Sequence, residues 1–178
     1  MQHLLIVDLE ATCWDDRPQT VQEMEVIEFG CAHASTHGVV SRTFSQLVRP
    51  VFNPEISEFC QSLTGITQGM VGEAPDYPEA VRRLDAITAE LEIDAWASWG
   101  QYDRNQIAVE LERHGIAPAF FTAPHINLKA LWQDRKGSKR RAGLGSALRS
   151  LGMQFEGRQH RGEDDAKNIA RILPYLDL

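Results

Sequence analysis

The feature that most constrains the fold is an apolar run that ends abruptly in two carboxylates. Residues 4–7 read Leu-Leu-Ile-Val, and Asp8 and Glu10 follow directly. A short, continuous apolar run bounded by polar residues is typical of a strand buried on both faces, in the middle of a sheet. Because side chains alternate along a strand, both carboxylates point to one face, roughly 6.6 Å apart at about 3.3 Å rise per residue.

Two like charges at the end of an apolar strand are unfavourable unless a compensating partner is present. A divalent cation between Asp8 and Glu10 is one such partner. A solvated strand end is the alternative, and this motif alone does not exclude it.

The pattern along the rest of the chain predicts an α/β fold. Further strands are expected at residues 26–32, 39–48, 94–99 and 125–128. Helices are expected at 56–63, from 78 to 91, at 104–114, from 128, at 143–151 and at 163–173. Three early strands, followed by helices that alternate with two more strands, predict a mixed five-stranded sheet covered by helices. We expect a single domain over residues 1–178.

Composition and charge exclude several classes of protein. The chain has 18 Lys plus Arg against 25 Asp plus Glu, a net charge of −7, which argues against a generally basic nucleic-acid coat protein but allows a local basic site. The three cysteines form no C-x-x-C pair, which fits a reducing compartment without disulfides or cysteine-bound zinc. The apolar start is too short for a secretion signal or a membrane span, so a cytoplasmic protein without membrane contact is expected.

Two further segments contain carboxylates that suit catalysis. Asp103 follows the expected fourth strand, where a helix N-cap is the alternative role because Asp is among the best capping residues. Residues 160–168 read His-Arg-Gly-Glu-Asp-Asp-Ala-Lys-Asn. Acidic residues in a first helical turn complement the helix dipole, but Asp165 is expected near the buried edge of its helix. For His160, in the preceding loop, a solvated side chain is the alternative.

Together these motifs resemble the DEDDh family of 3′→5′ exonucleases, and among them most closely the Eri-type exoribonucleases and the KapD-like bacterial proteins. The resemblance covers nearly the whole chain. It rests on four stretches in the family's order and spacing, at residues 7–13 (VDLEATC), 25–29 (EVIEF), 59–67 (FCQSLTGIT) and 160–169 (HRGEDDAKNI). It implies a ribonuclease-H-like exonuclease fold.

The resemblance implies a metal centre and a general base. Asp8, Glu10, Asp103 and Asp165 would hold two Mg²⁺ ions, which Mn²⁺ can replace, and His160 would be the base. Carboxylates without a thiolate suit these hard cations rather than zinc. Two such ions can hold an attacking water and a leaving oxygen in line across a phosphate. An ordinary histidine, with a pKa near 6.5, can accept a proton near neutral pH.

The resemblance also implies contacts with the substrate. Thr12 would lie near the terminal sugar, and Ile66 would wedge beside the terminal base. Tyr102 stands where Eri-type proteins often have Trp, and its ring can stack on a base. Ordinary packing is the alternative for Ile66 and Tyr102.

A basic run completes the candidate sites. Five of the seven residues at 135–141 are Lys or Arg. Such a run is often a solvated loop, but it also suits contacts with a phosphate backbone. The residues that we predict to make these contacts are Lys136, Lys139, Arg140 and Arg141.

The sequence therefore predicts a metal-dependent 3′→5′ exonuclease that releases nucleoside 5′-monophosphates from single-stranded 3′ ends, with RNA expected over DNA. Two alternatives remain open at this stage. One is a DNA-directed exonuclease of the proofreading or repair kind. The other is a KapD-like regulatory binding protein that acts through a protein partner.

Overall fold

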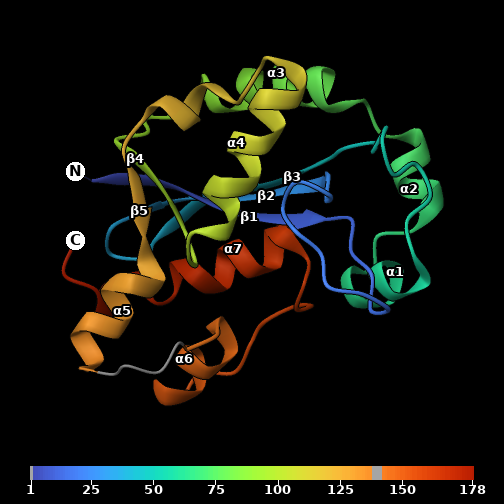
Figure 1. Ribbon diagram of the computed structural model, residues 1–178. Helices are drawn as coiled ribbons and strands as arrows, with labels where there is room; N and C mark the ends of the chain where they lie inside the picture. Colours follow the sequence, from blue (N-terminus) through green and yellow to red (C-terminus); the bar gives the residue numbers. More distant parts are fainter. Residues whose placement is uncertain (1, 138–141) are drawn as a thin grey trace.

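A mixed five-stranded sheet with the order β3-β2-β1-β4-β5 forms the centre of the protein (Figure 1). The computed structural model describes residues 2–137 and 142–178. The strands are β1 (His3–Ala11), β2 (Val26–Ser35), β3 (Val40–Leu47), β4 (Ala95–Ser98) and β5 (His125–Asn127). β2 is antiparallel to both β1 and β3, whereas β1, β4 and β5 run parallel to one another. The predicted mixed sheet, with the apolar strand in its middle, is confirmed.

Helices cover both faces of this sheet (Figure 1). One face packs against α5 (Leu128–Lys136), α6 (Leu144–Ser150) and α7 (Gly162–Ala170). The other packs against α3 (Tyr77–Thr88), α4 (Tyr102–His114) and the 3₁₀ turn η1 (Ala119–Thr122). A smaller core holds α1 (Glu58–Thr64) and α2 (Gln68–Glu73). Within the described ranges, no helix has the length and apolar character needed to cross a bilayer.

The burial of β1 explains why its sequence is apolar on both sides. Leu4 and Ile6 belong to the core under α5, α6 and α7, while Leu5 and Val7 belong to the core under α3 and α4. All four side chains are fully buried. A strand with a core on each face cannot tolerate alternating polar residues, and polar residues enter only where β1 reaches the edge of the packed layers.

Two local expectations were incomplete. The sequence did not predict α2, a six-residue helix that contains two glycines and so has weak intrinsic helix propensity. Thr67 compensates by capping it, since its hydroxyl accepts a hydrogen bond from the backbone N–H of Met70. The last helix ends at Ala170 rather than at residue 173, and a 3₁₀ turn (Leu173–Tyr175) that contains Pro174 follows it.

The first turn of α7 lies against β1 and β2 at backbone contact distance. A Cβ atom added to Gly30 in β2 would lie 1.8 Å from the carbonyl carbon of Gly162. A Cβ atom added to Gly162 would lie 2.6 Å from the backbone oxygen of Asp8. Both positions therefore require glycine for space, and this contact places α7 beside the carboxylate end of β1.

Replacement of Gly30 by Ala should push α7 away from the sheet. We expect Gly30→Ala to lower the free energy of unfolding by about 1–3 kcal/mol or more, since overpacked sites typically cost this much. Gly72→Ala is the matched control, because a Cβ atom there meets nothing within 4 Å and alanine favours the helix. Thermal denaturation of the two variants measures the difference, and an unchanged Tm for Gly30→Ala would contradict the close contact.

Candidate active site

Three carboxylates meet where β1 ends and α7 begins. One oxygen atom from each of Asp8, Glu10 and Asp165 lies within 4.8 Å of the other two. Asp8 and Glu10 therefore point to the same face of β1, as strand alternation predicted. Glu10 is buried, and Asp8 and Asp165 are half-buried. Oxygen atoms at this spacing can share one divalent cation.

Asp103 approaches the same place from α4. It is 5% exposed, and its Oδ1 atom accepts a hydrogen bond from the backbone N–H of Leu9 at 3.0 Å. The helix begins one residue after Gln101, which is its N-cap. The capping alternative for Asp103 is therefore wrong. Its carboxylate instead ties α4 to β1, next to the cluster of Asp8, Glu10 and Asp165.

One cavity of about 380 Å³ brings all the predicted catalytic residues together. We call it the active-site cavity. Asp8, Glu10, Asp103, His160 and Asp165 all line it, although they come from three separate segments of the chain. Its remaining lining is mostly apolar and includes Leu9, Ala11, Cys13, Met24, Leu63, Trp99, Tyr102 and Leu144. The carboxylates in this lining suit a cation, and its apolar side chains suit a flat, uncharged ring.

His160 lies in an unusual backbone conformation at this cavity. Its φ is 61°, in the left-handed region that few residues other than glycine adopt. The Asp165 carboxylate accepts hydrogen bonds from the backbone N–H groups of His160 and Arg161, the latter at 3.2 Å. These bonds fold the loop back onto the start of α7. The exposed imidazole therefore lies beside Asp165 without being buried with it.

Glu28 holds α7 in place, and the sequence analysis gave it no role. This fully buried carboxylate accepts hydrogen bonds from the Gly162 backbone N–H at 3.0 Å and from the Arg161 guanidinium at 3.2 Å. It lies directly opposite Glu10 in the register of β1 and β2. The available signal was a glutamate within the otherwise apolar first seven residues of β2, since a charge there needs a dedicated partner.

Burial raises the pKa of all four carboxyl groups, those of Asp8, Glu10, Asp103 and Asp165. For each group burial is the largest cause, and neighbouring carboxylates add to it at Asp8 and Glu10. Hydrogen bonds from backbone N–H groups oppose part of the rise at Asp103 and Asp165. The pKa of Asp8 lies well above its usual range, and the pKa values are about 9 for Glu10, about 6 for Asp103 and about 7 for Asp165.

This set of groups fits a hard divalent cation. Protons held by the metal-free carboxyls can be replaced by a cation that neutralises the same charge. Cys13 also lines the cavity, but a hydrogen bond with Cys60, together with burial, raises the pKa of the Cys13 thiol. It stays neutral, so the charged ligands available here are oxygen atoms. Such sites favour Mg²⁺, Mn²⁺ or Ca²⁺ over zinc.

Two predicted substrate contacts lie inside the protein instead. The Thr12 hydroxyl accepts a hydrogen bond from the Glu25 backbone N–H at 3.0 Å, and Thr12 is 1% exposed. Ile66 is fully buried in the core around α1 and α2. Neither residue lines the active-site cavity. Leu63, at the end of α1, lines it in place of Ile66.

The other residues predicted to contact the substrate, Tyr102 and the basic run, lie in different places relative to the cavity. Tyr102 lines the cavity and is 37% exposed, so part of its surface is accessible from the cavity, and stacking on a base stays a prediction. Lys136 lies at the end of α5, outside the cavity, with its Nζ atom 4.9 Å from the centre of the Trp132 ring. Lys139, Arg140 and Arg141 lie outside the described residues.

The raised pKa values predict how metal-free stability depends on pH. The folded state keeps protons on Asp165 and Glu10 up to about pH 7 and 9, whereas the unfolded chain releases them near pH 4. The folded state thus binds more protons, so the free energy of unfolding falls as pH rises through this window. We expect the Tm in chelator to fall between pH 5 and 9.

The same argument predicts that Mg²⁺ raises the Tm more at pH 8 than at pH 6, because a cation offsets repulsion that grows with pH. Thermal denaturation with Mg²⁺ and with chelator measures both effects. Glu10→Gln should weaken the pH dependence in chelator. A metal effect that is the same at both pH values would contradict the proton–metal exchange.

Comparisons with known proteins identify relatives of this chain. A family model described as exonuclease, RNase T, matches residues 5–173. The 3′-5′ exoribonuclease 1 of Rattus norvegicus is 32% identical over 178 residues, and the match covers 96% of this chain and 51% of that protein. The chain thus spans about half the length of the curated relatives that it matches first.

Two solved structures share the architecture closely. One is the nuclease domain of 3′hExo, a DEDDh family member, bound to rAMP, with a TM-score of 0.86 and 32% identity over 98% of this chain and 90% of that one. The other is a 3′-exonuclease described in its 3′-end specific recognition of a histone mRNA stem-loop. It has a TM-score of 0.87 and 32% identity, covering 98% of this chain and 80% of that one.

Proposed function

This chain belongs to the RNase T exonuclease family, and from that premise we propose that it is a metal-dependent 3′→5′ exonuclease that removes nucleotides from single-stranded 3′ ends. The single observation that carries the proposal is the convergence of four carboxylates and one histidine in one cavity. RNA is the proposed substrate, since the relatives that are at least 30% identical include 3′-5′ exoribonucleases. The products would be nucleoside 5′-monophosphates.

The metal ligands of this proposal are the clustered carboxylates. Asp8, Glu10, Asp103 and Asp165 would together hold two Mg²⁺ ions. Mn²⁺ has similar ligand preferences and can substitute. When bound, two such ions supply a nucleophilic water of lowered pKa and stabilise the charge on the phosphate. Glu28 acts indirectly, because its bonds to α7 hold Asp165 at this position.

The protein's own contribution to the reaction is a proton acceptor and a binding site. His160 would take a proton from the attacking water as the water oxygen bonds to phosphorus and the bond to the 3′ oxygen breaks. That oxygen takes up a proton from solvent and becomes the 3′-hydroxyl group of the shortened strand. Since His160 is exposed, it can pass its proton to solvent after each turnover. Leu63 and Tyr102 would flank the terminal base, with Leu63 in the role first expected of Ile66.

A direct test uses 5′-labelled single-stranded RNA, the matching DNA and a circular RNA. With Mg²⁺ we expect shortening from the 3′ end, faster on RNA, and no cleavage of the circle. Chelator should abolish activity, and Asp8→Asn should lower it strongly. Cleavage of the circle would identify an endonuclease, faster turnover of DNA would identify a DNA-directed enzyme, and binding without turnover would favour a regulatory protein.

The general base has a separate test. His160→Ala should lower kcat by on the order of 10²–10⁴-fold, the usual contribution of a positioned base. The KM and the metal-induced rise in Tm should change little. His37→Ala, which removes an exposed histidine from the β2–β3 hairpin, is the matched control. Wild-type turnover by His160→Ala would assign His160 to the loop without a chemical role.

A further inference from the structure

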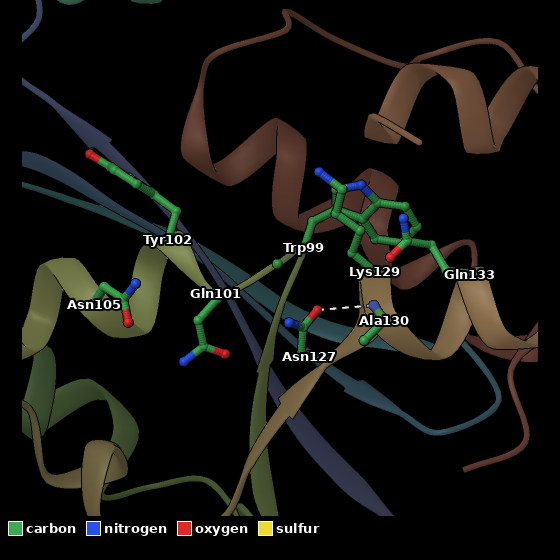
Figure 2. Close-up of a pocket in the computed structure, with 9 residues that line it drawn as sticks. Trp99, Gln101, Tyr102, Asn105, Asn127, Lys129, Ala130 and Gln133 are labelled. Carbon is green, nitrogen blue, oxygen red and sulfur yellow. Dashed lines mark hydrogen bonds between the residues drawn. The ribbon is translucent and has the colours of Figure 1, made fainter. Parts of the chain in front are cut away.

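A second cavity, of about 480 Å³, adjoins the active-site cavity near the carboxyl ends of β4 and β5 (Figure 2). We call it the amide cavity, after the four amide side chains among its nine lining residues. Trp99 and Tyr102 line both cavities, so the two share a wall. The other residues that line the amide cavity are Gly100, Gln101, Asn105, Asn127, Lys129, Ala130 and Gln133.

The chemistry of the amide cavity differs from that of its neighbour. Figure 2 shows Tyr102 and Asn105 of α4 on one side, Lys129 and Gln133 of α5 on the other, and Gln101 and Asn127 between them. No carboxylate lines it. Amides both donate and accept hydrogen bonds, which suits base edges and ribose hydroxyls, whereas an ammonium group suits phosphate. The cavity therefore has groups for each part of a nucleotide.

Only some of the polar side chains in the amide cavity form hydrogen bonds that stabilise the fold. The Asn127 Oδ1 atom accepts a hydrogen bond from the Ala130 backbone N–H at 3.0 Å, which fixes that amide at the start of α5. The side chains of Gln101 and Asn105 are exposed and make no hydrogen bond with the described part of the chain. Two amides at the mouth of a cavity are thus available to a ligand.

A continuous surface leads from the shared wall along α5. Lys129, Gln133 and Lys136 are spaced four and three residues apart, which places them on one face of the helix. The Trp99 and Trp132 rings lie 6.4 Å apart, and Lys136 lies over Trp132. Trp132 is only 3% exposed, so what this surface offers a strand is its two lysines, the half-buried Lys129 and the exposed Lys136, which suit the phosphates of a strand of any sequence.

A strand whose terminal nucleotide occupies the active-site cavity must leave that cavity along one of its walls. We propose that it leaves through the amide cavity, which binds the nucleotides immediately 5′ of the scissile phosphate. Lys129 contacts a backbone phosphate there, and Gln101 and Asn105 contact the base or the ribose. This inference rests on the proposed function and adds to it the path of the strand.

Another cavity, of about 300 Å³ beside α6, offers the competing route. It contains one cation, Arg149, and shares Leu144, His160 and Asp165 with the active-site cavity. A strand lying there would cover His160, which must return its proton to solvent. The amide cavity leaves that imidazole open, and Tyr102 and Trp99 provide surfaces for stacking at its entrance. Both considerations favour the route over α5.

The test compares Lys129→Gln and Asn105→Ala with two control variants. Arg149→Gln removes one positive charge from the competing route, and Arg82→Gln removes one from α3, on the opposite face of the sheet. Lys129→Gln also removes one charge, so long-range electrostatics change equally in the three glutamine variants. Each protein is assayed on a single-stranded RNA tetranucleotide and on the p-nitrophenyl ester of uridine 5′-monophosphate, which has no upstream nucleotide.

We expect Lys129→Gln to lower kcat/KM for the tetranucleotide by about tenfold relative to the ester, mainly through KM, as for a lost hydrogen bond to a charged group. Asn105→Ala should act in the same direction. The salt dependence of KM should flatten by about 0.7 in logarithmic slope for the lost phosphate contact. Arg149→Gln and Arg82→Gln should leave the ratio of the two substrates unchanged.

Binding of a 5′-fluorescein-labelled tetranucleotide, followed by anisotropy, makes the test independent of turnover. A larger effect of Arg149→Gln than of Lys129→Gln, on kcat/KM or on Kd, would overturn the proposed route in favour of α6. Equal losses on both substrates would also overturn it. Wild-type protein that hydrolyses neither substrate would contradict the proposed function, while the Kd values would still decide the path of the strand.

Discussion

The close contact between the first turn of α7 and the sheet is the constraint on which the active site depends. There is no room for a β-carbon at Gly30 or Gly162, and the Glu28 carboxylate accepts a hydrogen bond from the Gly162 backbone N–H. This combination fixes α7 in position and orientation. Asp165 then reaches Asp8 and Glu10, and its own bonds to the preceding loop place His160 beside the same cavity.

The same arrangement makes the metal-free site electrostatically unfavourable. Burial raises the pKa of these carboxyl groups because the charged form loses its hydration, and at Asp8 and Glu10 repulsion from neighbouring carboxylates raises it further. A protein that only had to fold would gain stability from neutral side chains here. The cluster is instead explained by a ligand of opposite charge, and the neutral Cys13 thiol leaves oxygen as the ligand type. The clustered carboxyl groups therefore lower the stability of the metal-free fold and favour the binding of a cation.

The parallel strands place the active-site cavity and the amide cavity at a common edge of the sheet. The acidic cluster lies at the end of β1. Trp99 directly follows β4, and Asn127 is the last residue of β5. Open α/β sheets commonly bind ligands at the carboxyl ends of their strands, because helices begin there and loops leave space. Here the active-site cavity and the amide cavity are neighbours along that edge. Tyr102 belongs to both, so a change at this residue acts on the two cavities at once.

The sequence by itself determined the α/β class, the central position of β1 and the common face of Asp8 and Glu10. These properties follow from local periodicity, since covalent geometry repeats every two residues along a strand. The tertiary structure alone decided that Glu28 anchors α7, that Asp103 bonds to Leu9 rather than capping its helix, and that Thr12 and Ile66 face inward. Each of these outcomes depends on a partner in another element, and packing between elements sets such distances rather than the spacing along the chain.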